Sequence, residues 1–371
     1  MGIFKKFIYS VSLLSGTIIG VGFFSLPYIT SKVGLPLMLL YFFILGTLVI
    51  IIHLFYGEIV LRTPDFLRFP GYAEIYLGKT GRKIAFLAVI LGIFGALLAY
   101  LIVGGQFLTK LLSPIFGGNN LTWTFFYFSL GTILIFFGIK PITKTELLGL
   151  ILFFLILILI FFQGLPYLKI KHLFPEINLS WFFLPYGPIL FSLWGAALIP
   201  EVEVVLEKEK RLLKKVIPLS ILIPIFIYLF FIFIILGVTG SQVSETALVG
   251  LENFLGKQIV NLGLFLGLLT TFTSFIAIGL VLRNIFLYDL KFSKNLAWLI
   301  TCFIPLFLFL TNIGDFISVI GFVGGVMLGI EGILIILMYQ KIKAKSKIKF
   351  LTYPLILIFL LGIIYQIIYF F

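Results

Sequence analysis

Residues 15–27 read SGTIIGVGFFSLP, an apolar stretch with three glycines in its first eight residues and a proline at its end. Glycine weakens a helix interior by about 1 kcal/mol relative to alanine, and proline cannot continue a helical hydrogen-bond ladder. The stretch lies inside a longer apolar run, residues 7–31, which is long enough to cross a membrane. We therefore expect a membrane-spanning helix that is interrupted partway along its length.

A second stretch repeats this pattern. Residues 191–200 read FSLWGAALIP, and the spacing from Gly195 to Pro200 equals that from Gly22 to Pro27. Interrupted spans at matching positions of two halves of a chain indicate the binding site of a secondary transporter. The alternative is that these glycines only let neighbouring helices pack closely.

Composition narrows the class of protein. Of the 371 residues, 61% are hydrophobic and 11% are charged, against about 45–50% and about 25% in soluble domains. These values exclude a soluble enzyme, a disordered chain and a nucleic-acid-binding domain. A secreted disulfide scaffold is excluded as well, because Cys302 is the one cysteine in the sequence.

The apolar runs predict an all-α polytopic membrane protein with about eleven transmembrane helices. A β-barrel is excluded because the runs are continuously apolar and do not alternate. We expect one domain, residues 1–371, with a first repeat near 7–166, a second near 182–339 and an extra helix near 350–371. The expected spans are 7–31, 35–61, 84–109, 123–139, 146–166, 182–206, 216–238, 258–288, 295–311, 315–339 and 350–371.

The basic residues predict the orientation of these spans. If the connections alternate sides, five of the 27 lysines and arginines fall on one side and the rest on the side of the N-terminus. Cytoplasmic connections carry the excess of lysine and arginine. We expect a cytoplasmic N-terminus and a location in the cell membrane. The five are Lys32, Lys110, Lys169, Lys171 and Lys257.

Interruption of a helix inside a bilayer has a chemical consequence. The freed N–H and C=O groups cannot be satisfied by lipid, so they must face a ligand or a polar cavity. Amides at the start of a half-helix favour an anionic group, and freed carbonyls favour a cation. A site with both is suited to a zwitterion such as an amino acid.

The motif of residues 16–27, together with residues 185–200 and Glu201, resembles the amino acid/auxin and aromatic amino acid permease group. That group belongs to the amino acid–polyamine–organocation superfamily, whose members share the five-plus-five inverted-repeat fold of the bacterial leucine transporter. The resemblance implies this fold, with broken helices 1 and 6. Eleven spans also match the group.

The resemblance also implies a set of substrate-binding residues. The substrate carboxylate would meet backbone amides of the first interruption, and its ammonium group would meet carbonyls of the second. Aromatic side chains would shape the pocket for the substrate side chain. The expected residues are Gly16, Thr17, Gly20, Val21, Gly22, Phe23, Tyr100, Ser192, Leu193, Trp194 and Gly195.

A sodium site is expected between the first and eighth spans. Thr270, Thr273 and Ser274 are spaced i, i+3 and i+4 and share one helix face. With the carbonyls of Gly16 and Ile19 they would form an oxygen shell for a hard cation, similar to the family's sodium site. The alternative is that these hydroxyl groups bond to their own helix.

The chain departs from the leucine transporter at its other sodium site. That site needs a polar side chain where this sequence has Phe23 and Phe191, so we expect at most one sodium ion. Some proton-coupled relatives carry a lysine in the fifth span, and residues 147–166 contain none. Sodium is therefore the expected coupling ion.

Ionisable residues inside spans are functional by default because they are costly to bury in a membrane. Glu331 is a candidate coupling carboxylate, and His53 is a weaker candidate for relaying a proton. Glu201 would pair with Arg82 or Lys83 as a gate, or form a solvated helix end. Glu58 is expected to pair with Arg62, and Asp315 to cap the helix that follows it.

The sequence thus predicts a secondary transporter that imports a neutral, apolar or aromatic amino acid by alternating access, coupled to sodium. The first alternative keeps the fold and couples to protons through Glu331 or His53. A membrane-embedded enzyme or a channel is a further alternative. We expect no enzymatic activity, no cofactor other than the sodium ion, no nucleic-acid partner and no obligatory protein partner. The lipid bilayer and the amino acid are the expected partners.

Overall fold

The computed structural model describes residues 2–138, 143–175, 179–343 and 348–370, which form helices and one isolated bridge between Ser244 and Ala247. The α-helices are α1 (Ile3–Ile18), α2 (Leu26–Val33), α3 (Leu35–Arg62), α4 (Phe69–Phe116), α5 (Asn120–Phe137), α6 (Thr143–Gly164), α7 (Tyr186–Leu193), α8 (Ile199–Leu206), α9 (Leu213–Thr239), α10 (Glu252–Leu255), α11 (Lys257–Asn284), α12 (Lys294–Leu310), α13 (Phe316–Phe322), α14 (Leu328–Ile342) and α15 (Ile348–Phe370).

Shorter helical segments connect these helices. The segments used below are η1 (Val21–Ser25), η5 (Ala196–Leu198), η6 (Glu207–Leu212), η9 (Ile285–Asp289) and η10 (Val323–Met327). The last two are π-helical. Such wide turns recur at functional sites in helices, and η10 lies inside the expected span 315–339.

The described helices confirm a polytopic, all-helical membrane protein. Seven of them are long and apolar enough to cross a bilayer, or eight when the bent pair α1 and η1–α2 is counted as one span. This is fewer than the eleven expected ranges, and the difference lies in three places. Around α6 only Phe154–Tyr167 enters the count, α12 has 17 residues, and residues 186–242 count as one continuous stretch.

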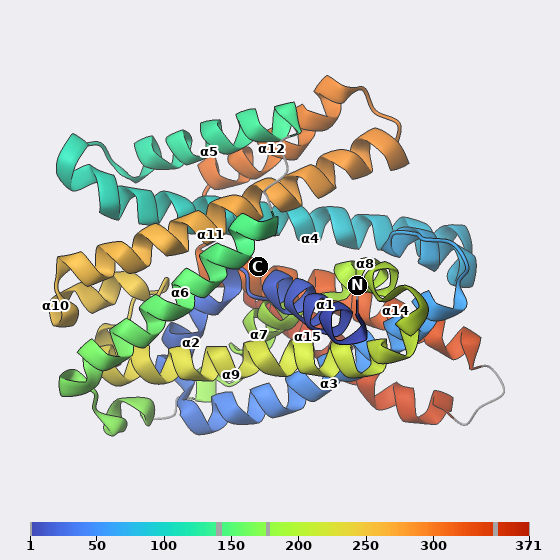
Figure 1. Ribbon diagram of the computed structural model, residues 1–371, viewed down its shortest axis with the longest axis horizontal. Helices are drawn as coiled ribbons and strands as arrows, with labels where there is room; N and C mark the ends of the chain where they lie inside the picture. The colour runs from blue at the N-terminus through green and yellow to red at the C-terminus, as the bar shows by residue number, and fades with distance from the viewer. Residues whose placement is uncertain (1, 139–142, 176–178, 344–347, 371) are drawn as a thin grey trace.

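The helices form two groups that meet along α4, α13 and α14. In the first group α1, α2, α7 and α8 pack against α3 and α9. In the second group α4, α5, α11 and α12 pack against one another. Figure 1 shows this second group at the top of the view and α3 and α9 at the bottom. The interrupted pairs therefore belong to one group, next to the boundary with the other.

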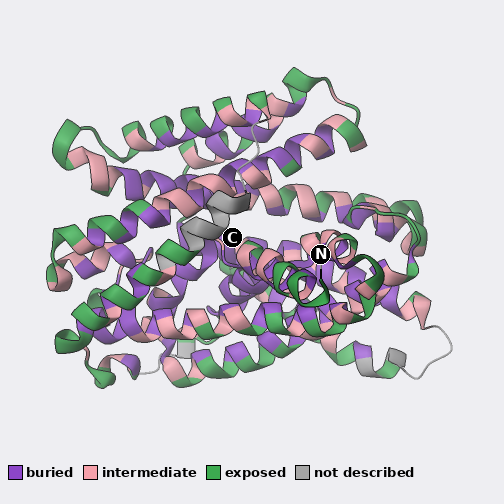
Figure 2. Cartoon of the chain, in the orientation of Figure 1, coloured by how far each residue is buried: buried purple, intermediate pink, exposed green. Residues whose placement is uncertain are grey.

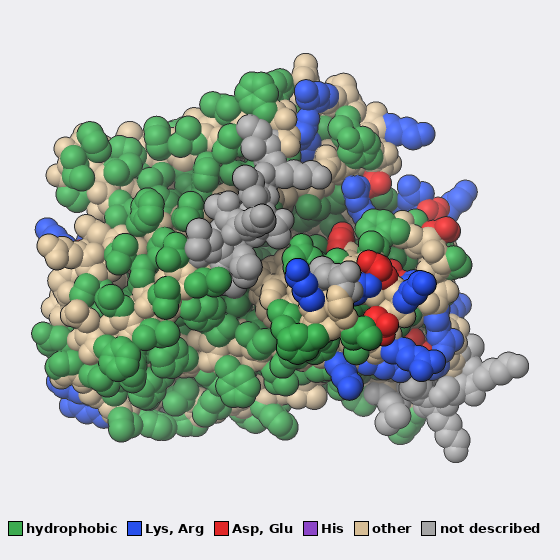
Figure 3. Space-filling view, viewed as in Figure 1, with side chains coloured by type: hydrophobic (Ala, Val, Ile, Leu, Met, Phe, Trp, Pro, Cys, Tyr) green, Lys and Arg blue, Asp and Glu red, His purple; other side chains and the backbone are tan. Residues whose placement is uncertain are grey.

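Large apolar side chains cover the outside of these groups. Phe43, Phe226 and Phe307 are each more than 60% exposed, and the exposed residues alternate with buried ones along every long helix (Figure 2). A water-soluble protein would bury such side chains, whereas lipid tails solvate them. The apolar surface seen in Figure 3 is thus the expected contact with a bilayer.

Charged side chains gather at one end of the molecule, on the right in Figure 3. We call this the basic end, and the opposite end the far end. Ion pairs join several elements at the basic end: Lys6 with Glu207, Arg68 with Asp289, Arg82 with Glu74, Arg62 and Lys343 with Glu58, and Lys210 with Glu203. Lys140, Lys345 and Lys347 of the predicted basic set lie outside the described residues.

Two local predictions at helix ends are confirmed. The Arg62 guanidinium donates to the Glu58 carboxylate over 2.8 Å, as an i, i+4 pair should. The Asp315 side chain accepts from the Ser318 amide over 2.7 Å and so caps α13.

Glycines bring α7 very close to α13 and η10. A Cβ built on Gly324 would overlap the Gly187 carbonyl oxygen, and one built on Gly187 would overlap the Gly321 carbonyl oxygen. The two backbones touch because these positions have no side chain. This contact holds the first half of the second interrupted span against the helix that leads into Glu331.

The glycine contact yields a stability prediction. Gly324→Ala must push α7 away from η10, and we expect it to destabilise the protein by about 1–3 kcal/mol, as overpacking does. The measurement is the thermal unfolding midpoint of the purified protein in detergent. Gly92→Ala is the matched control, because a Cβ there would meet Met327 at an ordinary 3.5 Å. Equal midpoints for the two variants would contradict the prediction.

Candidate functional site

The first interruption lies between α1 and η1. Helix α1 ends at Ile18, Gly20 is extended, and the two helical parts are bent by 52°. A Cβ on Gly22 would lie 2.5 Å from the Ser192 Oγ. Gly22 therefore needs to be glycine so that the first interruption can touch the end of α7.

The second interruption lies between α7 and η5. The Gly195 amide donates to the Nε2 of His53 over 2.9 Å, and the Nδ1 of His53 lies 2.8 Å from the Val49 carbonyl oxygen. These two bonds require a neutral imidazole with its proton on Nδ1. The buried ring of His53 thus stabilises an amide that the interruption leaves without a helical partner.

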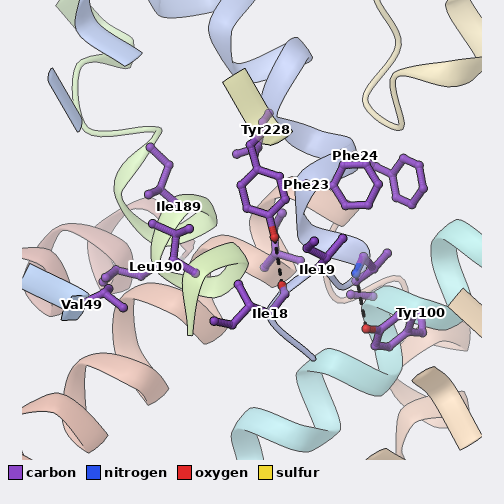
Figure 4. Close-up of a cluster of buried hydrophobic side chains, with 14 of the residues drawn as sticks. Ile18, Ile19, Phe23, Phe24, Val49, Tyr100, Ile189, Leu190 and Tyr228 are labelled. Carbon is purple, nitrogen blue, oxygen red and sulfur yellow. Dashed lines mark hydrogen bonds between the residues drawn. The ribbon is translucent and has the colours of Figure 1, made fainter. Parts of the chain in front are cut away.

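One tyrosine of α9 touches both interruptions. The hydroxyl group of Tyr228 lies 3.0 Å from the Ile18 carbonyl oxygen and 2.9 Å from the Ser192 carbonyl oxygen. Figure 4 shows its side chain pointing from α9 at the end of α1. On the other side, the Tyr100 hydroxyl of α4 accepts a 3.4 Å bond from the Val21 amide. Side chains of both helix groups therefore satisfy the interrupted backbone.

Aromatic rings surround the first interruption. The rings of Phe23 and Tyr228 are parallel, with centroids 5.7 Å apart, and Phe231 meets Phe23 edge-on at 5.0 Å. Phe24 meets Phe23 at 4.2 Å and Phe107 of α4 at 5.2 Å. Offset and edge-on contacts of this kind are favourable between aromatic groups. Aromatic side chains of three elements thus line the first interruption.

The structure brings most of the predicted substrate residues together. Those at the two interruptions or in contact with them are Gly20, Val21, Gly22, Phe23, Tyr100, Ser192, Leu193, Trp194 and Gly195. Gly16 and Thr17 lie earlier, inside α1. Gly16 adjoins open space, and the exposed Thr17 hydroxyl donates to the Leu13 carbonyl of its own helix over 3.0 Å.

The predicted sodium ligands lie on two helices, α1 and α11, which both pack against α6 and otherwise have different main neighbours. Helix α1, with Gly16, packs against α6, α8 and α9, whereas α11 packs chiefly against α4, α5, α6 and α12. The Thr270 hydroxyl donates to Gly267 over 2.9 Å, and the Thr273 hydroxyl donates to Thr270 over 3.1 Å. These two hydroxyl groups donate to their own helix and keep oxygen lone pairs that a cation could use, so the sodium site stays a prediction. Ile19 is the residue directly after the end of α1.

Glu331 lies next to the second interruption. Its carboxylate accepts a 3.0 Å hydrogen bond from the Trp194 indole, and the residue is only 8% exposed. The Trp194 ring also meets His53 edge-on at 5.1 Å. The carboxyl group of Glu331 is thus hydrogen-bonded to Trp194, the residue at which α7 stops. Trp194, expected to line the substrate pocket, also serves this polar contact.

Glu201 lies near the start of α8. Of the two basic residues considered as its partner, Arg82 bonds instead to Glu74 over 2.8 Å. A bend at Gly78 divides α4 into a short first part and a long second part. Arg82 belongs to the second part and bonds to Glu74 of the first part. Within the described residues, the Glu201 Oε2 is buried without a hydrogen-bond partner, so this carboxylate is not a fully solvated helix end.

Two hollows lie away from the interruptions. One of about 400 Å³ at the far end is lined by polar and basic residues, among them Lys169, Lys171 and His172. The other, of about 150 Å³, is apolar and lies between α4, α5 and α11. Their linings contain none of the interrupted residues.

Sequence reasoning missed Tyr228. The signal was present, because a tyrosine in the middle of the apolar run 216–238 carries a hydroxyl group that must find a partner in a membrane. The partner itself could not be read from the run, since the two carbonyl groups belong to residues 18 and 192.

The model of the tryptophan/tyrosine permease family matches residues 4–369. The chain belongs to this family. It is accordingly a membrane transport protein and not an enzyme, which confirms the expected class and excludes the membrane-enzyme alternative.

One curated relative and two solved structures give further comparisons. The tyrosine-specific transport system 1 of Haemophilus influenzae is 31% identical over 113 residues, which cover 30% of this permease and 28% of that relative. The match thus spans less than a third of the relative's length.

The solved structures show the fold. A nucleobase-cation-symport-1 family transporter, in a closed conformation with bromovinylhydantoin bound, matches with a TM-score of 0.67 at 15% identity, covering 97% of this chain and 90% of that chain. MhsT in complex with L-phenylalanine matches with a TM-score of 0.61 at 16% identity, covering 96% and 98%. These likenesses support the inverted-repeat architecture of the leucine-transporter fold.

The contact between His53 and the second interruption yields a prediction. His53→Leu leaves the buried Gly195 amide without its acceptor, and we expect a loss of about 1–3 kcal/mol in stability. His53→Gln is the matched control, because its side-chain oxygen can accept the same bond. The thermal unfolding midpoint of each purified variant is the measurement. The interpretation fails if the glutamine variant unfolds as early as the leucine variant.

Proposed function

We propose that this permease carries an aromatic amino acid, tyrosine or tryptophan, across the cell membrane by alternating access. The observation that carries the proposal is the pair of interrupted helices, joined by Tyr228 and surrounded by aromatic rings. Membership of the tryptophan/tyrosine permease family and the names of its relatives support the choice of substrate.

The interruptions offer complementary groups for a zwitterion. The carboxylate of the substrate would bind at the amides around Gly20 and Gly22, where Tyr100 already meets the Val21 amide and where the Gly20 amide would exchange its 2.9 Å bond to the Ile18 carbonyl for the carboxylate. Its ammonium group would bind at the carbonyls of Ile18 and Ser192. Its side chain would lie among Phe23 and the neighbouring rings, because stacking favours an aromatic over an aliphatic group.

The proposed topology has eleven crossings and a cytoplasmic N-terminus. Repeats 7–166 and 182–339 would have opposite orientations, and the span near 350–371 would be additional. The basic end would then face the cytoplasm, in accord with the bias of lysine and arginine. The group of α1, α2, α3, α7, α8 and α9 would rock against α4, α5, α11 and α12 around the interruptions, since these are the packing groups of the structure.

A proton is the coupling ion that the contacts favour. Glu331 is buried and bonded to Trp194 at the second interruption, so gain or loss of its proton changes a contact of the substrate site. His53 is a poorer carrier, because protonation of Nε2 would break its bond to Gly195. Sodium, the coupling ion expected from the sequence, is the second candidate, through Gly16, Ile19, Thr270, Thr273 and Ser274.

The transport experiment uses the purified protein in proteoliposomes with radiolabelled tyrosine, tryptophan, phenylalanine and leucine. We expect accumulation of the aromatic amino acids in preference to leucine under an inward proton gradient. Accumulation driven by sodium alone would contradict proton coupling and favour the second candidate. In that case Thr273→Ala combined with Ser274→Ala should abolish sodium dependence. No uptake of any aromatic amino acid under either gradient would contradict the proposed substrate.

Glu331→Gln tests the coupling residue. A neutral amide keeps a partner for the Trp194 indole but cannot exchange a proton, so we expect gradient-driven accumulation to fall about tenfold or more while exchange of internal for external tyrosine persists. Glu252→Gln is the control, because that carboxylate pairs with Lys110 at the far end. Unimpaired proton-driven accumulation by Glu331→Gln would remove Glu331 from the coupling mechanism.

A further inference from the structure

The hydroxyl group of Tyr228 has one proton and two carbonyl acceptors. A hydroxyl group donates one hydrogen bond at a time, yet the Ile18 and Ser192 oxygens lie 3.0 Å and 2.9 Å away. The Ile18 oxygen also accepts from the Gly20 amide over 2.9 Å, so when Tyr228 donates to Ile18 the Ser192 oxygen keeps a lone pair for a second donor. Three oxygen atoms from three elements, α1, α7 and α9, converge here.

The ring that carries this hydroxyl group is fixed in place. Tyr228 is completely buried. The face of its ring is parallel to that of Phe23, whose ring also meets Phe231. Because Phe23 belongs to η1, the ring contact ties α9 to the same interruption that its hydroxyl group touches. Tyr228 thus holds the two carbonyls at a set distance from one point.

A second polar group nearby lacks a partner. The Ser192 Oγ is buried, with the residue 2% exposed, and bonds to nothing within the described ranges. It lies against Gly22, where a Cβ would come within 2.5 Å. A buried hydroxyl group without a partner is costly, so this position is suited to a bound polar group.

We propose that Tyr228 is the positioning residue that gives the site its affinity for the α-ammonium group of the substrate. The inference rests on the proposed function. The hydroxyl group keeps the Ile18 and Ser192 carbonyls converged, and the ammonium group donates to the lone pairs that the tyrosine leaves unsatisfied. An ammonium group is suited to this role because it has three donors and a positive charge.

The experiment compares two ligands that differ in the ammonium group alone. Dissociation constants are measured for tyrosine and for 3-(4-hydroxyphenyl)propionate, which lacks the amine, by displacement of radiolabelled tyrosine from the purified protein. We expect Tyr228→Phe to weaken tyrosine about tenfold, as loss of alignment for a charged hydrogen bond does, and to leave the affinity for the propionate unchanged. The readout is the affinity ratio, defined as the affinity for tyrosine divided by the affinity for the propionate.

Tyr56→Phe is the matched control, because Tyr56 is equally buried and its hydroxyl group has no hydrogen-bond partner among the described residues. It should leave the ratio at the wild-type value. Equal weakening of both ligands by Tyr228→Phe would show a merely structural role and overturn the inference. Tighter binding of tyrosine would overturn it too, because the hydroxyl group would then compete with the ammonium group.

A second variant covers the case in which Tyr228→Phe does not fold. Phe23→Leu keeps the Tyr228 hydroxyl group and removes the phenylalanine ring that stacks on the tyrosine ring. The affinity ratio should therefore fall in this variant as well. An unchanged ratio in folded Phe23→Leu protein would contradict the positioning role. Wild-type protein that binds no tyrosine, tryptophan or phenylalanine would instead overturn the proposed function, and the inference with it.

Discussion

Backbone groups inside a membrane need hydrogen-bond partners, and this requirement governs the centre of the molecule. A continuous helix meets it alone, but α1 and α7 stop inside the apolar region and leave amides and carbonyls unpaired. The partners come from side chains of other helices. The Tyr228 hydroxyl lies within hydrogen-bond distance of two carbonyls and donates to one of them at a time, His53 accepts from one amide, and Tyr100 accepts from another.

These partners lie on both sides of the boundary between the helix groups. Tyr228 and His53 belong to the group that contains the interruptions, whereas Tyr100 comes from α4 in the other group. Relative movement of the groups would therefore alter the pairing of Val21 before that of Ile18 or Ser192. The close contact of Gly187 with α13 and η10 adds a second connection, because backbone atoms meet there without side chains between them.

The charged residues divide into two classes by position. Most of the ion pairs lie at the basic end, where partly exposed pairs such as Arg62 with Glu58 contribute little to stability. Glu331 differs because it is buried and accepts from Trp194 beside an interruption. Its position, and not the number of surface charges, makes it the carboxylate of interest for coupling.

The sequence by itself determined the membrane class, the two interruptions, the Glu58–Arg62 pair and the Asp315 cap. Each of these depends on residues near one another in the chain: runs of apolar side chains, the Gly22–Pro27 and Gly195–Pro200 spacings, and contacts three or four residues apart. Local patterns of this kind act through helix geometry, so they can be read without knowledge of the fold.

Only the tertiary structure decided which side chains complete the interrupted backbone. Tyr228 bonds to a residue 210 positions away, and His53 to one 142 positions away, and no spacing rule connects such residues. Arg82, considered as a partner of Glu201, bonds instead to Glu74, because the bend at Gly78 between them brings the two side chains together. A hydrogen bond acts over about 3 Å, so its partner is set by how the helices pack, which the apolar pattern of each helix alone does not specify.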